Sequence, residues 1–420
     1  MREMKDSGIE WIGKIPDDWN AIRIKFLAKR IIVGLAMPVT QHYVDDGIPM
    51  FRNTNIEEDN LNDSDILYLN PSFAKSQSSK WIKTNDILTI HTGYIGKSCV
   101  VPAKYNNALT FTTLITTPDV RKVNVRFLMY SINASRGKSI IYLVESTAQN
   151  NLNTAVFVNL PISVPLLNEQ NTIVSFLDAK CSEIDSLHAD IEKQIETLEA
   201  YKKSVITEAV TKGLDPNVEM KVSGIEWIGE IPKDWEILKI GGLYSLRITK
   251  VSDVDYPPLS VTMKGILPQL ETAAKTNDHD NRKLVKKGDF AINSRSDRRG
   301  SCGISEYDGS VSLINTVLKP NRKIINRYYN WLFHTPIFAD EFYKWGHGIV
   351  DDLWTTGWQD MKNITVPFPS VNKQQQIADY LDAKCTEIES LISDKQKQLT
   401  LLEDYKKSLI YEYVTGKKEV

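Results

Sequence analysis

The residues with the clearest chemical potential form a glycine-rich stretch, HTGYIGKSC at residues 91–99. Its GKS end resembles a phosphate-binding loop, in which backbone N–H groups, a lysine and a hydroxyl hold a nucleoside triphosphate. That loop requires a glycine five residues before Gly96, where this chain has His91, and a helix after the hydroxyl residue. The sequence Cys-Val-Val-Pro follows instead and predicts a strand. The stretch is therefore expected not to bind ATP but to form a strand-turn-strand, in which Gly93 permits a tight turn.

Polar side chains in other loops form a mixture suited to a nucleic-acid surface. Asn and Gln can hydrogen-bond adenine edges and Arg can do so with guanine, whereas Lys, Ser and Thr suit phosphates. Lys97 and Ser98 are expected to face phosphate, or Thr92 and Tyr94 to approach base edges. The alternative is an ordinary set of solvated loops, which has the same composition. The candidate DNA-binding residues are Arg52, Asn53, Asn55, Lys75, Ser76, Thr92, Tyr94, Lys97, Ser98, Gln149, Asn150, Thr262, Lys264, Arg295, Arg298, Arg299 and Trp354.

An internal repeat organises the chain, and such repeats decide the fold. In the second copy, HTGYIGKSC falls on SRSDRRGSC at 294–302, so the arginines of that segment are the counterparts of the first turn. The chain is two copies of a unit of about 200 residues, with near-constant ends and divergent middles. The recurring stretches are SGIEWIGKIPDDW at 7–19 and SGIEWIGEIPKDW at 223–235, FLDAKCSEIDSL at 176–187 and YLDAKCTEIESL at 380–391, and LEAYKKSVITEAVT at 198–211 and LEDYKKSLIYEYVT at 402–415.

Composition narrows the function classes. The 420-residue chain has a net charge of −2, but residues 1–168 carry +3 and residues 219–370 carry +1, which permits DNA binding by these segments. No apolar run approaches the roughly 18 residues of a membrane span, and the start has no signal-peptide core, so a cytoplasmic protein is expected. The four cysteines are explained by duplication and the six histidines lack metal-ligand spacing, so reduced thiols and no metal site are expected.

Two long helices are expected to position the divergent middles. Apolar residues recur at heptad spacing within 170–211 and again after residue 370, without an interrupting proline. Heptads require a partner helix, and the simplest arrangement is an antiparallel coiled coil between the two copies. The alternative is that each helix packs on its own globular domain. The candidate interface residues are Leu177, Ile184, Ile191, Ile195, Leu198, Val205, Leu381, Ile388, Ile392, Leu399, Leu402 and Leu409.

The middles read as short strands and turns with one helical patch each, VRFLMYSI at 125–132 and YNWLFHTP at 329–336. The predicted fold class is α/β (α+β), with two globular domains built on twisted β-sheets, two long helices and a pseudo-twofold internal repeat. The expected domains are 1–165 (first globular domain), 166–215 (central helix), 216–368 (second globular domain) and 369–420 (C-terminal helix).

Together these residues resemble the specificity subunit of type I restriction-modification systems. The resemblance covers essentially the whole chain and rests on the paired SGIEWIG openings, the EQNTIVSFLDAK and KQQQIADYLDAK helix starts, and the YKKS helix ends. It implies two target-recognition domains, each reading a few base pairs of a split, asymmetric site in double-stranded DNA. It also implies helices that act as a spacer and dock two methyltransferase (M) subunits, which bind S-adenosylmethionine and methylate adenine.

Motor-nuclease (R) subunits, which need ATP and Mg²⁺, can join such a complex, and the specificity subunit itself is non-catalytic and binds no cofactor. This sequence agrees, because it has no N/D-P-P-Y/F methyltransferase tetrad; the nearest is YPPL at 256–259. The middles vary widely within the family, so the candidate DNA contacts rest on loop chemistry alone. The alternative function is a non-DNA tandem coiled-coil scaffold or adaptor, which would show no salt-dependent binding to duplex DNA.

Overall fold

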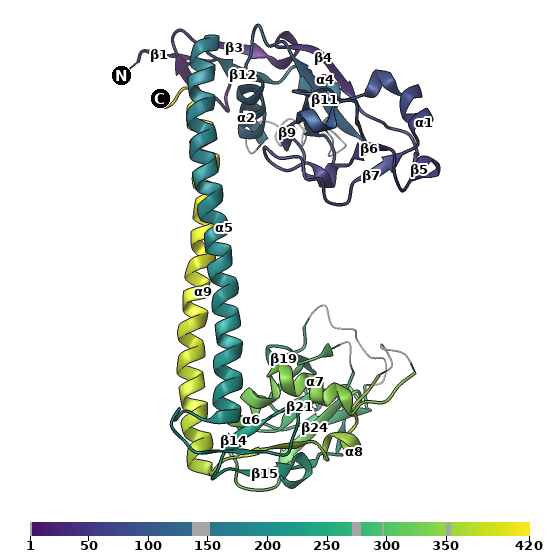
Figure 1. The fold of residues 1–420 in the computed structure, drawn as a ribbon, viewed down its shortest axis with the longest axis vertical. Helices are drawn as coiled ribbons and strands as arrows, with labels where there is room; N and C mark the ends of the chain where they lie inside the picture. The colour runs from purple at the N-terminus through teal and green to yellow at the C-terminus, as the bar shows by residue number, and fades with distance from the viewer. Residues whose placement is uncertain (1, 137–151, 271–278, 296–297, 350–353) are drawn as a thin grey trace. The chain divides into compact units, whose positions relative to one another are not determined.

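The structure, a computed structural model, describes residues 2–136, 152–270, 279–295, 298–349 and 354–420 (Figure 1). It divides into two compact units. Unit 1 comprises Met1–Ile191 and Lys397–Val420, and unit 2 comprises Glu192–Gln396. Each unit therefore contains one divergent middle and a part of each long helix, and the division crosses both helices instead of falling in a linker.

The long helices are α5 (Leu167–Lys212, 46 residues) and α9 (Val371–Val414, 44 residues). In unit 1 the start of α5 packs with the end of α9, and in unit 2 the end of α5 packs with the start of α9. The predicted antiparallel helix pair is thus confirmed. Of the predicted interface residues, five are buried: Leu177, Ile184, Leu381, Ile388 and Leu409. The other seven are half-buried: Ile191, Ile195, Leu198, Val205, Ile392, Leu399 and Leu402.

Ion pairs between the helices repeat in the two units. Lys406 Nζ lies 2.6 Å from Asp185 Oδ1 in unit 1, and Lys202 pairs with Glu389 in unit 2. Each residue of one pair is displaced by 204 positions from its counterpart in the other. The two copies therefore use the same antiparallel register between the helices, as the internal repeat predicts.

The globular part of unit 1 is a set of small, mostly antiparallel sheets. Only the pairing of β6 with β10 is parallel among the named ladders of the described residues. The two-stranded ladders are β1 (Met4–Asp6) with β2 (Lys14–Pro16) and β3 (Asn20–Arg23) with β12 (Pro161–Val164). The four-stranded sheets run β4 (Ala28–Val33), β11 (Thr113–Pro118), β8 (Ile87–Ile90), β9 (Ser98–Val100), and β10 (Leu109–Thr110), β6 (Ile48–Phe51), β7 (Leu67–Leu69), β5 (Tyr43–Val44). The helices are α1 (Pro71–Ser76), α2 (Val125–Ser135) and α4 (Thr154–Val158).

Unit 2 repeats this plan with changes in the outer strands. The repeated ladders are β13 (Met220–Val222) with β14 (Glu230–Pro232), β15 (Glu236–Lys239) with β25 (Thr365–Phe368), and the sheet β16 (Tyr244–Leu246), β24 (Asn315–Pro320), β21 (Phe290–Asn293), β22 (Cys302–Ile304). The remaining ladders are β17 (Lys250–Val251), β20 (Arg282–Val285), β23 (Gly309–Val311), and β18 (Leu259–Thr262) with β19 (Gly265–Pro268). The helices are α6 (Asn326–Phe333), α7 (Pro336–Lys344) and α8 (Trp358–Met361). Both domains are thus β-rich and of the α+β type, without the parallel sheet of an α/β fold.

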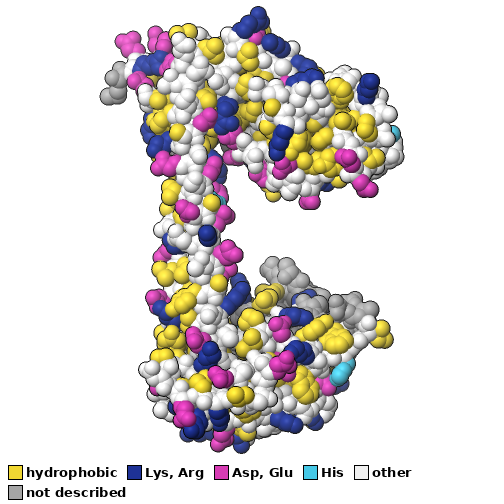
Figure 2. All heavy atoms as spheres, in the orientation of Figure 1, with side chains coloured by type: hydrophobic (Ala, Val, Ile, Leu, Met, Phe, Trp, Pro, Cys, Tyr) yellow, Lys and Arg dark blue, Asp and Glu magenta, His cyan; other side chains and the backbone are white. Residues whose placement is uncertain are grey.

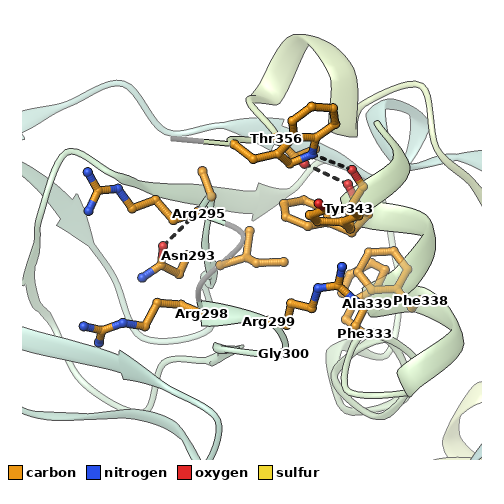
Figure 3. A pocket seen from close by; sticks show the side chains of 14 residues that line it. Asn293, Arg295, Arg298, Arg299, Gly300, Phe333, Phe338, Ala339, Tyr343 and Thr356 are labelled. Atoms are coloured by element: carbon orange, nitrogen blue, oxygen red, sulfur yellow. Dashed lines mark hydrogen bonds between the residues drawn. The ribbon is translucent and has the colours of Figure 1, made fainter. Parts of the chain in front are cut away.

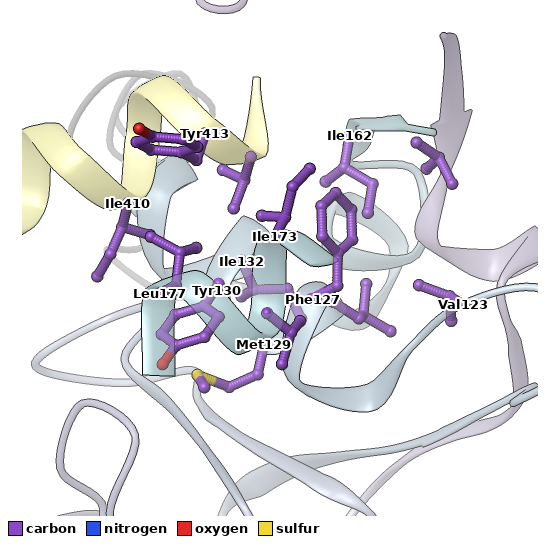
Figure 4. Close-up of a cluster of buried hydrophobic side chains, with 14 of the residues drawn as sticks. Val123, Phe127, Met129, Tyr130, Ile132, Ile162, Ile173, Leu177, Ile410 and Tyr413 are labelled. Carbon is purple, nitrogen blue, oxygen red and sulfur yellow. The ribbon is translucent and has the colours of Figure 1, made fainter. Parts of the chain in front are cut away.

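The main core of each unit joins the globular part to the helix pair. In unit 1, Phe127 and Tyr130 of α2 pack with Leu177 of α5 and with Ile410 and Tyr413 of α9 (Figure 4). In unit 2, α6 contributes to a corresponding cluster with the end of α5 and the start of α9. Burial of large apolar side chains is the main stabilising term in such a core. Each domain is therefore mounted on a two-helix platform.

No helix in the described part of the chain is both long and apolar enough to cross a membrane. All four cysteines are buried and free of disulfide bonds. Burial raises the pKa of the Cys181 thiol to about 11, so this thiol stays protonated at neutral pH. Among the described residues, no three His, Cys, Asp or Glu side chains meet in a metal-binding arrangement.

Candidate nucleic-acid interface

The β8–β9 turn, residues 91–97, carries three exposed residues, Thr92, Gly93 and Tyr94. Gly93 and Gly96 adopt positive φ angles of 85° and 82°, which only glycine adopts readily, and β9 begins directly afterwards. The predicted strand-turn-strand is confirmed, and a strand stands where a triphosphate loop needs a helix. Tyr94 is 77% exposed, and Lys97 Nζ lies 5.6 Å from its ring centroid. The turn thus presents an aromatic ring beside a positive charge, a pairing that suits bases and phosphates.

Three more candidate residues lie in the short 3-10 helix Asn53–Asn55 and at Arg52, the residue before it. Asn53 Nδ2 donates to Thr92 O over 3.2 Å, so this side chain supports the turn. Arg52 donates to Asp65 O over 2.8 Å. The prediction for Asn55 is corrected: its side chain is buried and caps the short helix by accepting from Arg52 N and donating to the chain nearby. No face of Asn55 is left for DNA.

The prediction for Ser98 is also corrected. Its hydroxyl is fully buried, lies 2.8 Å from Thr89 Oγ1 and donates to Gly96 O over 3.0 Å. Ser98 is the first residue of β9, where the side chain turns inward, and so it cannot face a phosphate. Lys75 and Ser76 are exposed, but they lie on α1, whose Ala74 packs in a separate cluster. The structure therefore does not group them with the turn. Gln149 and Asn150 lie outside the described residues.

In unit 2, the segment between β21 and β22 occupies the place of the β8–β9 turn. Arg295, Arg298 and Arg299 are exposed there. In Figure 3, Arg295 and Arg298 point away from the aromatic side chains of the pocket, whereas Arg299 points towards them. The predicted correspondence between the two segments thus has a structural counterpart, although the side chains differ in kind.

An aromatic stack adjoins this arginine segment. The Arg299 guanidinium lies 4.0 Å from the Tyr343 ring centroid (Figure 3). The Tyr343 and Trp354 rings stack at 5.5 Å between centroids. Arg299 also pairs with Asp340 at 3.1 Å. A backbone bridge joins Arg295 to Thr355, which brings Trp354 to the same place as the arginines. This is the strongest grouping of predicted residues in unit 2.

The β18–β19 hairpin carries the last two candidates. Thr262 Oγ1 donates to Gly265 O over 2.9 Å and accepts from Lys264 N over 3.1 Å, so it closes the hairpin tip. Gly303 of β22 packs so tightly on Gly265 that an added Cβ would lie 2.8 Å from the Gly265 Cα. The hairpin is therefore fixed against the strand that follows the arginine segment, with the Lys264 side chain exposed.

Charge on the surface is mixed. On the face drawn in Figure 2, Lys and Arg side chains stand among Asp and Glu instead of forming one continuous basic area. This agrees with the near-neutral net charge of −2. On this face, DNA contacts would therefore depend on local groups such as the two segments above.

Sequence reasoning missed the polar contacts that mount each domain on its helix. In unit 1, Asp178 Oδ1 accepts hydrogen bonds from Arg126 Nε and Tyr130 OH, each at 2.8 Å. In unit 2, Asp382 Oδ1 accepts from Trp331 Nε1 at 2.8 Å, and the same carboxylate pairs with Arg327. Two sequence patterns mark these contacts. Asp178 and Asp382 share the repeated LDAK motif of the long helices, and each domain helix has Arg as its second residue and an aromatic residue four positions later.

Two fully buried glutamines were missed as well. Gln170 Oε1 accepts from Asn124 N at 2.7 Å, and Gln374 Oε1 accepts from Ile325 N at 2.9 Å. Their amides donate to Pro165 O and Pro369 O. Each glutamine thus fixes the loop before the domain helix to the start of a long helix, and this explains the Gln in both repeated helix starts.

Comparisons with known proteins agree with this architecture. The type I restriction modification DNA specificity domain family matches residues 16–197 and 232–401. A Methanocaldococcus jannaschii chain assigned as the MjaX specificity subunit of a type I restriction enzyme is 25% identical, over 97% of this chain and 96% of its own. The HsdS subunit of Thermoanaerobacter tengcongensis has a similar fold, with a TM-score of 0.54 at 14% identity over 96% of this chain and 98% of its own. A chain solved in a study of complex assembly in a type I R-M system reaches a TM-score of 0.66 at 13% identity, over 95% and 98%.

Proposed function

Because this chain belongs to the family of type I restriction-modification DNA specificity subunits, which are non-catalytic, we propose that its two domains each read one half of a split DNA site. The first domain reads its half through the β8–β9 turn, with Thr92, Tyr94 and Lys97. The second reads through the arginine segment and the aromatic stack beside it. The expected domains at 1–165 and 216–368 are thus proposed as the two target-recognition domains.

One observation carries this proposal. The two domains repeat their central ladders. The described residues between the equivalent strands β8–β9 and β21–β22 include exposed side chains in both domains, and these side chains differ in chemistry. Tyr94 offers an aromatic ring for stacking and Lys97 offers one positive charge. The second segment offers several guanidinium groups, each of which can form two hydrogen bonds with a guanine edge. A duplicated scaffold with unlike contact residues suits an asymmetric site with two unlike halves.

The helix pair is proposed to dock two copies of a methyltransferase subunit. Leu187 and Leu391 are 47% and 46% exposed, and Tyr201 and Tyr405 are 48% and 54% exposed. Each pair is related by the 204-residue repeat, so both units present the same unpartnered apolar side chains. Exposed aromatic residues favour protein interfaces, and a repeated surface suits two copies of one partner. The chain solved in the study of complex assembly supports a role within such a complex.

The partners are proposed to supply the chemistry. Methyltransferase subunits would hold S-adenosylmethionine, and motor-nuclease subunits, where present, would hold ATP and Mg²⁺. The contribution of this chain is to hold each recognition domain on the helix pair and to select the DNA. The exposed turn residues would select the DNA, and the residues that form polar contacts with the long helices would hold the domains.

Methylation mapping tests this function. The chain is co-expressed with methyltransferase subunits in a host without adenine methylation, and the genome is sequenced for N6-methyladenine. The expected result is one motif with two short defined halves and an unspecified gap of fixed length. A soluble complex that methylates nothing and shows no salt-dependent binding to duplex DNA would favour the scaffold alternative, and a continuous motif would contradict the assignment of one half-site to each domain.

A further inference from the structure

One aspartate of a long helix is contacted by an arginine and by an aromatic side chain of the domain helix in both units, and these two contacts are here called the helix clamp. It consists of Arg126, Tyr130 and Asp178 in unit 1, and of Arg327, Trp331 and Asp382 in unit 2. Arg327 Nη2 also donates to Asp379 Oδ1 at 2.6 Å. The two arginines and their aromatic neighbours come from the divergent middles, whereas the aspartates come from the constant ends. Middles that otherwise share little have thus kept the same contact to the same helix position.

Stability does not explain this repetition. The side chains of Arg126, Asp178, Arg327 and Asp382 are between 35% and 48% exposed. Ion pairs as exposed as these contribute about 0–1 kcal/mol, because solvent screens them and ordering the side chains costs entropy. The buried apolar clusters hold each domain far more strongly. A weak contact kept in both copies indicates a geometric role.

The clamp and the buried glutamines together fix the tilt of each domain on its long helix. Gln170 and Gln374 fix the start of each domain helix to a long helix, and the clamp aspartates lie eight residues further along, about 12 Å at 1.5 Å per residue. One contact point permits a tilt about that point, whereas two points fix the tilt. The glutamine acts as the fixed point and the clamp sets the orientation of the domain on its helix.

In unit 1 the clamp also reaches the β8–β9 turn. Arg126 Nη2 lies 2.6 Å from Asp59 Oδ2, and Asp59 N donates to Ser98 O over 3.2 Å. Asn133 of α2 bonds both backbone groups of Ser98, at 2.9 Å and 3.0 Å. A continuous path of polar contacts thus runs from the long helix to the residue that follows the turn. Movement of Arg126 would be passed directly to the DNA-reading segment.

We propose that Arg126 and Arg327 are positioning residues that set the tilt of each recognition domain on its helix and so the length of the unspecified gap that the protein accepts. This rests on the proposed function. Adjacent base pairs are about 3.4 Å apart, so a tilt that moves a reading segment by this distance changes the accepted gap by one base pair. The bases read within each half-site do not depend on the clamp.

The test measures methylation by the full complex on duplexes that share both half-sites and differ only in gap length. For Arg126→Met and Arg327→Met, we compare the methylation rate on gaps one base pair shorter or longer with the rate on the native gap. We expect this ratio to rise about fivefold, which corresponds to the roughly 1 kcal/mol of one exposed ion pair. The half-site sequences are expected to stay unchanged. The Tm is expected to stay unchanged for Arg327→Met, whose aspartate partners are exposed, and to fall modestly for Arg126→Met, because the partly buried Asp59 loses its ion-pair partner. Arg126→Lys keeps a positive charge near Asp178 and should restore most of the gap selectivity.

Arg121→Met is the matched control. Arg121 is an exposed arginine of the first domain whose guanidinium pairs with Asp119, so its loss removes the same charge and leaves the clamp residues in place. Unchanged gap selectivity in both clamp variants, or equal broadening in the control, would overturn the proposal. So would a large fall in Tm with equal loss on all gaps, which indicates a purely structural role. If the unaltered protein itself showed no gap selectivity, the proposed function would fail instead.

Discussion

Two neighbouring residues at the end of the β8–β9 turn differ in exposure, because strand β9 begins between them. Lys97 ends the turn with its side chain partly exposed beside Tyr94, whereas Ser98 opens β9 and is buried. The sequence GKS suggests equal access for both, because residue type alone does not show where a strand begins. Asn53 and Asn55 differ in the same way, one supporting the turn and the other capping a short helix inside the domain.

Lys97→Ala should weaken binding to all duplex DNA sequences alike. A phosphate-contacting lysine releases counterions on binding, so the variant is expected to lower the slope of log K against log salt by about one unit. Fluorescence anisotropy at several salt concentrations measures this slope. Lys29→Ala is the control, since Lys29 is an exposed lysine of β4 that is not among the candidate DNA contacts. A changed sequence preference with an unchanged slope would show that Lys97 contacts bases instead.

Asp59 should make stability depend on pH in the direction opposite to an ordinary ion-paired carboxylate. Burial raises the pKa of Asp59, although Arg126 opposes the shift. The folded chain then binds the proton more tightly than the unfolded chain, so the stabilising contribution is present below the unfolded pKa of about 4 and is lost as pH rises through the folded pKa. Asp59→Asn is expected to reduce the fall in Tm between pH 4 and pH 7, as measured by thermal unfolding.

Asp119 provides the control of opposite sign. Arg121 lowers the pKa of Asp119 to about 2, so its contribution is present above the unfolded pKa and is lost as pH falls from about 4 towards 2. Asp119→Asn should therefore reduce the loss of Tm on acidification and leave the range from pH 4 to pH 7 unchanged. Equal pH profiles for Asp59→Asn and the unaltered protein would contradict the role of burial at Asp59.

At the scale of elements, the buried glutamines are expected to matter more for folding than any exposed helix residue. Gln374→Leu leaves Ile325 N–H and Pro369 C=O without their partner, and each unsatisfied buried group costs about 1–3 kcal/mol. The two groups together cost about 2–6 kcal/mol, which lowers the Tm of a unit of about 200 residues by roughly 4–24 °C. Gln376→Leu is the matched control, because Gln376 is exposed on the same helix. Equal Tm values for the two variants would show that the buried amide is dispensable.

Elements were predictable where the pattern is local and repeated. Heptad spacing without proline predicted both long helices. Every residue proposed for their interface, such as Leu177 or Leu381, is buried or half-buried. The turn glycines predicted the β8–β9 turn because their pattern is also local. The clamp was not predicted, because Arg126 and Asp178 are 52 residues apart and come from segments of different variability. The repeated LDAK motif and the Arg and aromatic residues of each domain helix mark the two sides separately, but their contact depends on how α2 packs on α5.

At the scale of the whole chain, the duplication predicts that specificity is modular. Replacing residues 20–165 with the corresponding segment of another family member should change one half of the methylated motif and leave the other half intact. The reason is that the two middles contribute to separate cores, each completed by the constant helices. Methylation mapping of the chimaera measures the outcome. A motif changed in both halves would contradict the assignment of one domain to each half-site.

The division of unit 1 between two distant parts of the chain has a consequence for biosynthesis. Its core needs Ile410 and Tyr413, which the ribosome adds only after all 205 residues of Glu192–Gln396 have been made. At about 5–20 residues per second, this delay is on the order of 10–40 s. Unit 2, a continuous segment, has all its residues before unit 1 does. The domain that is translated first is therefore the last to be completed, and until then the apolar stripe at the start of α5 stays open to a chaperone or to the helix of another copy.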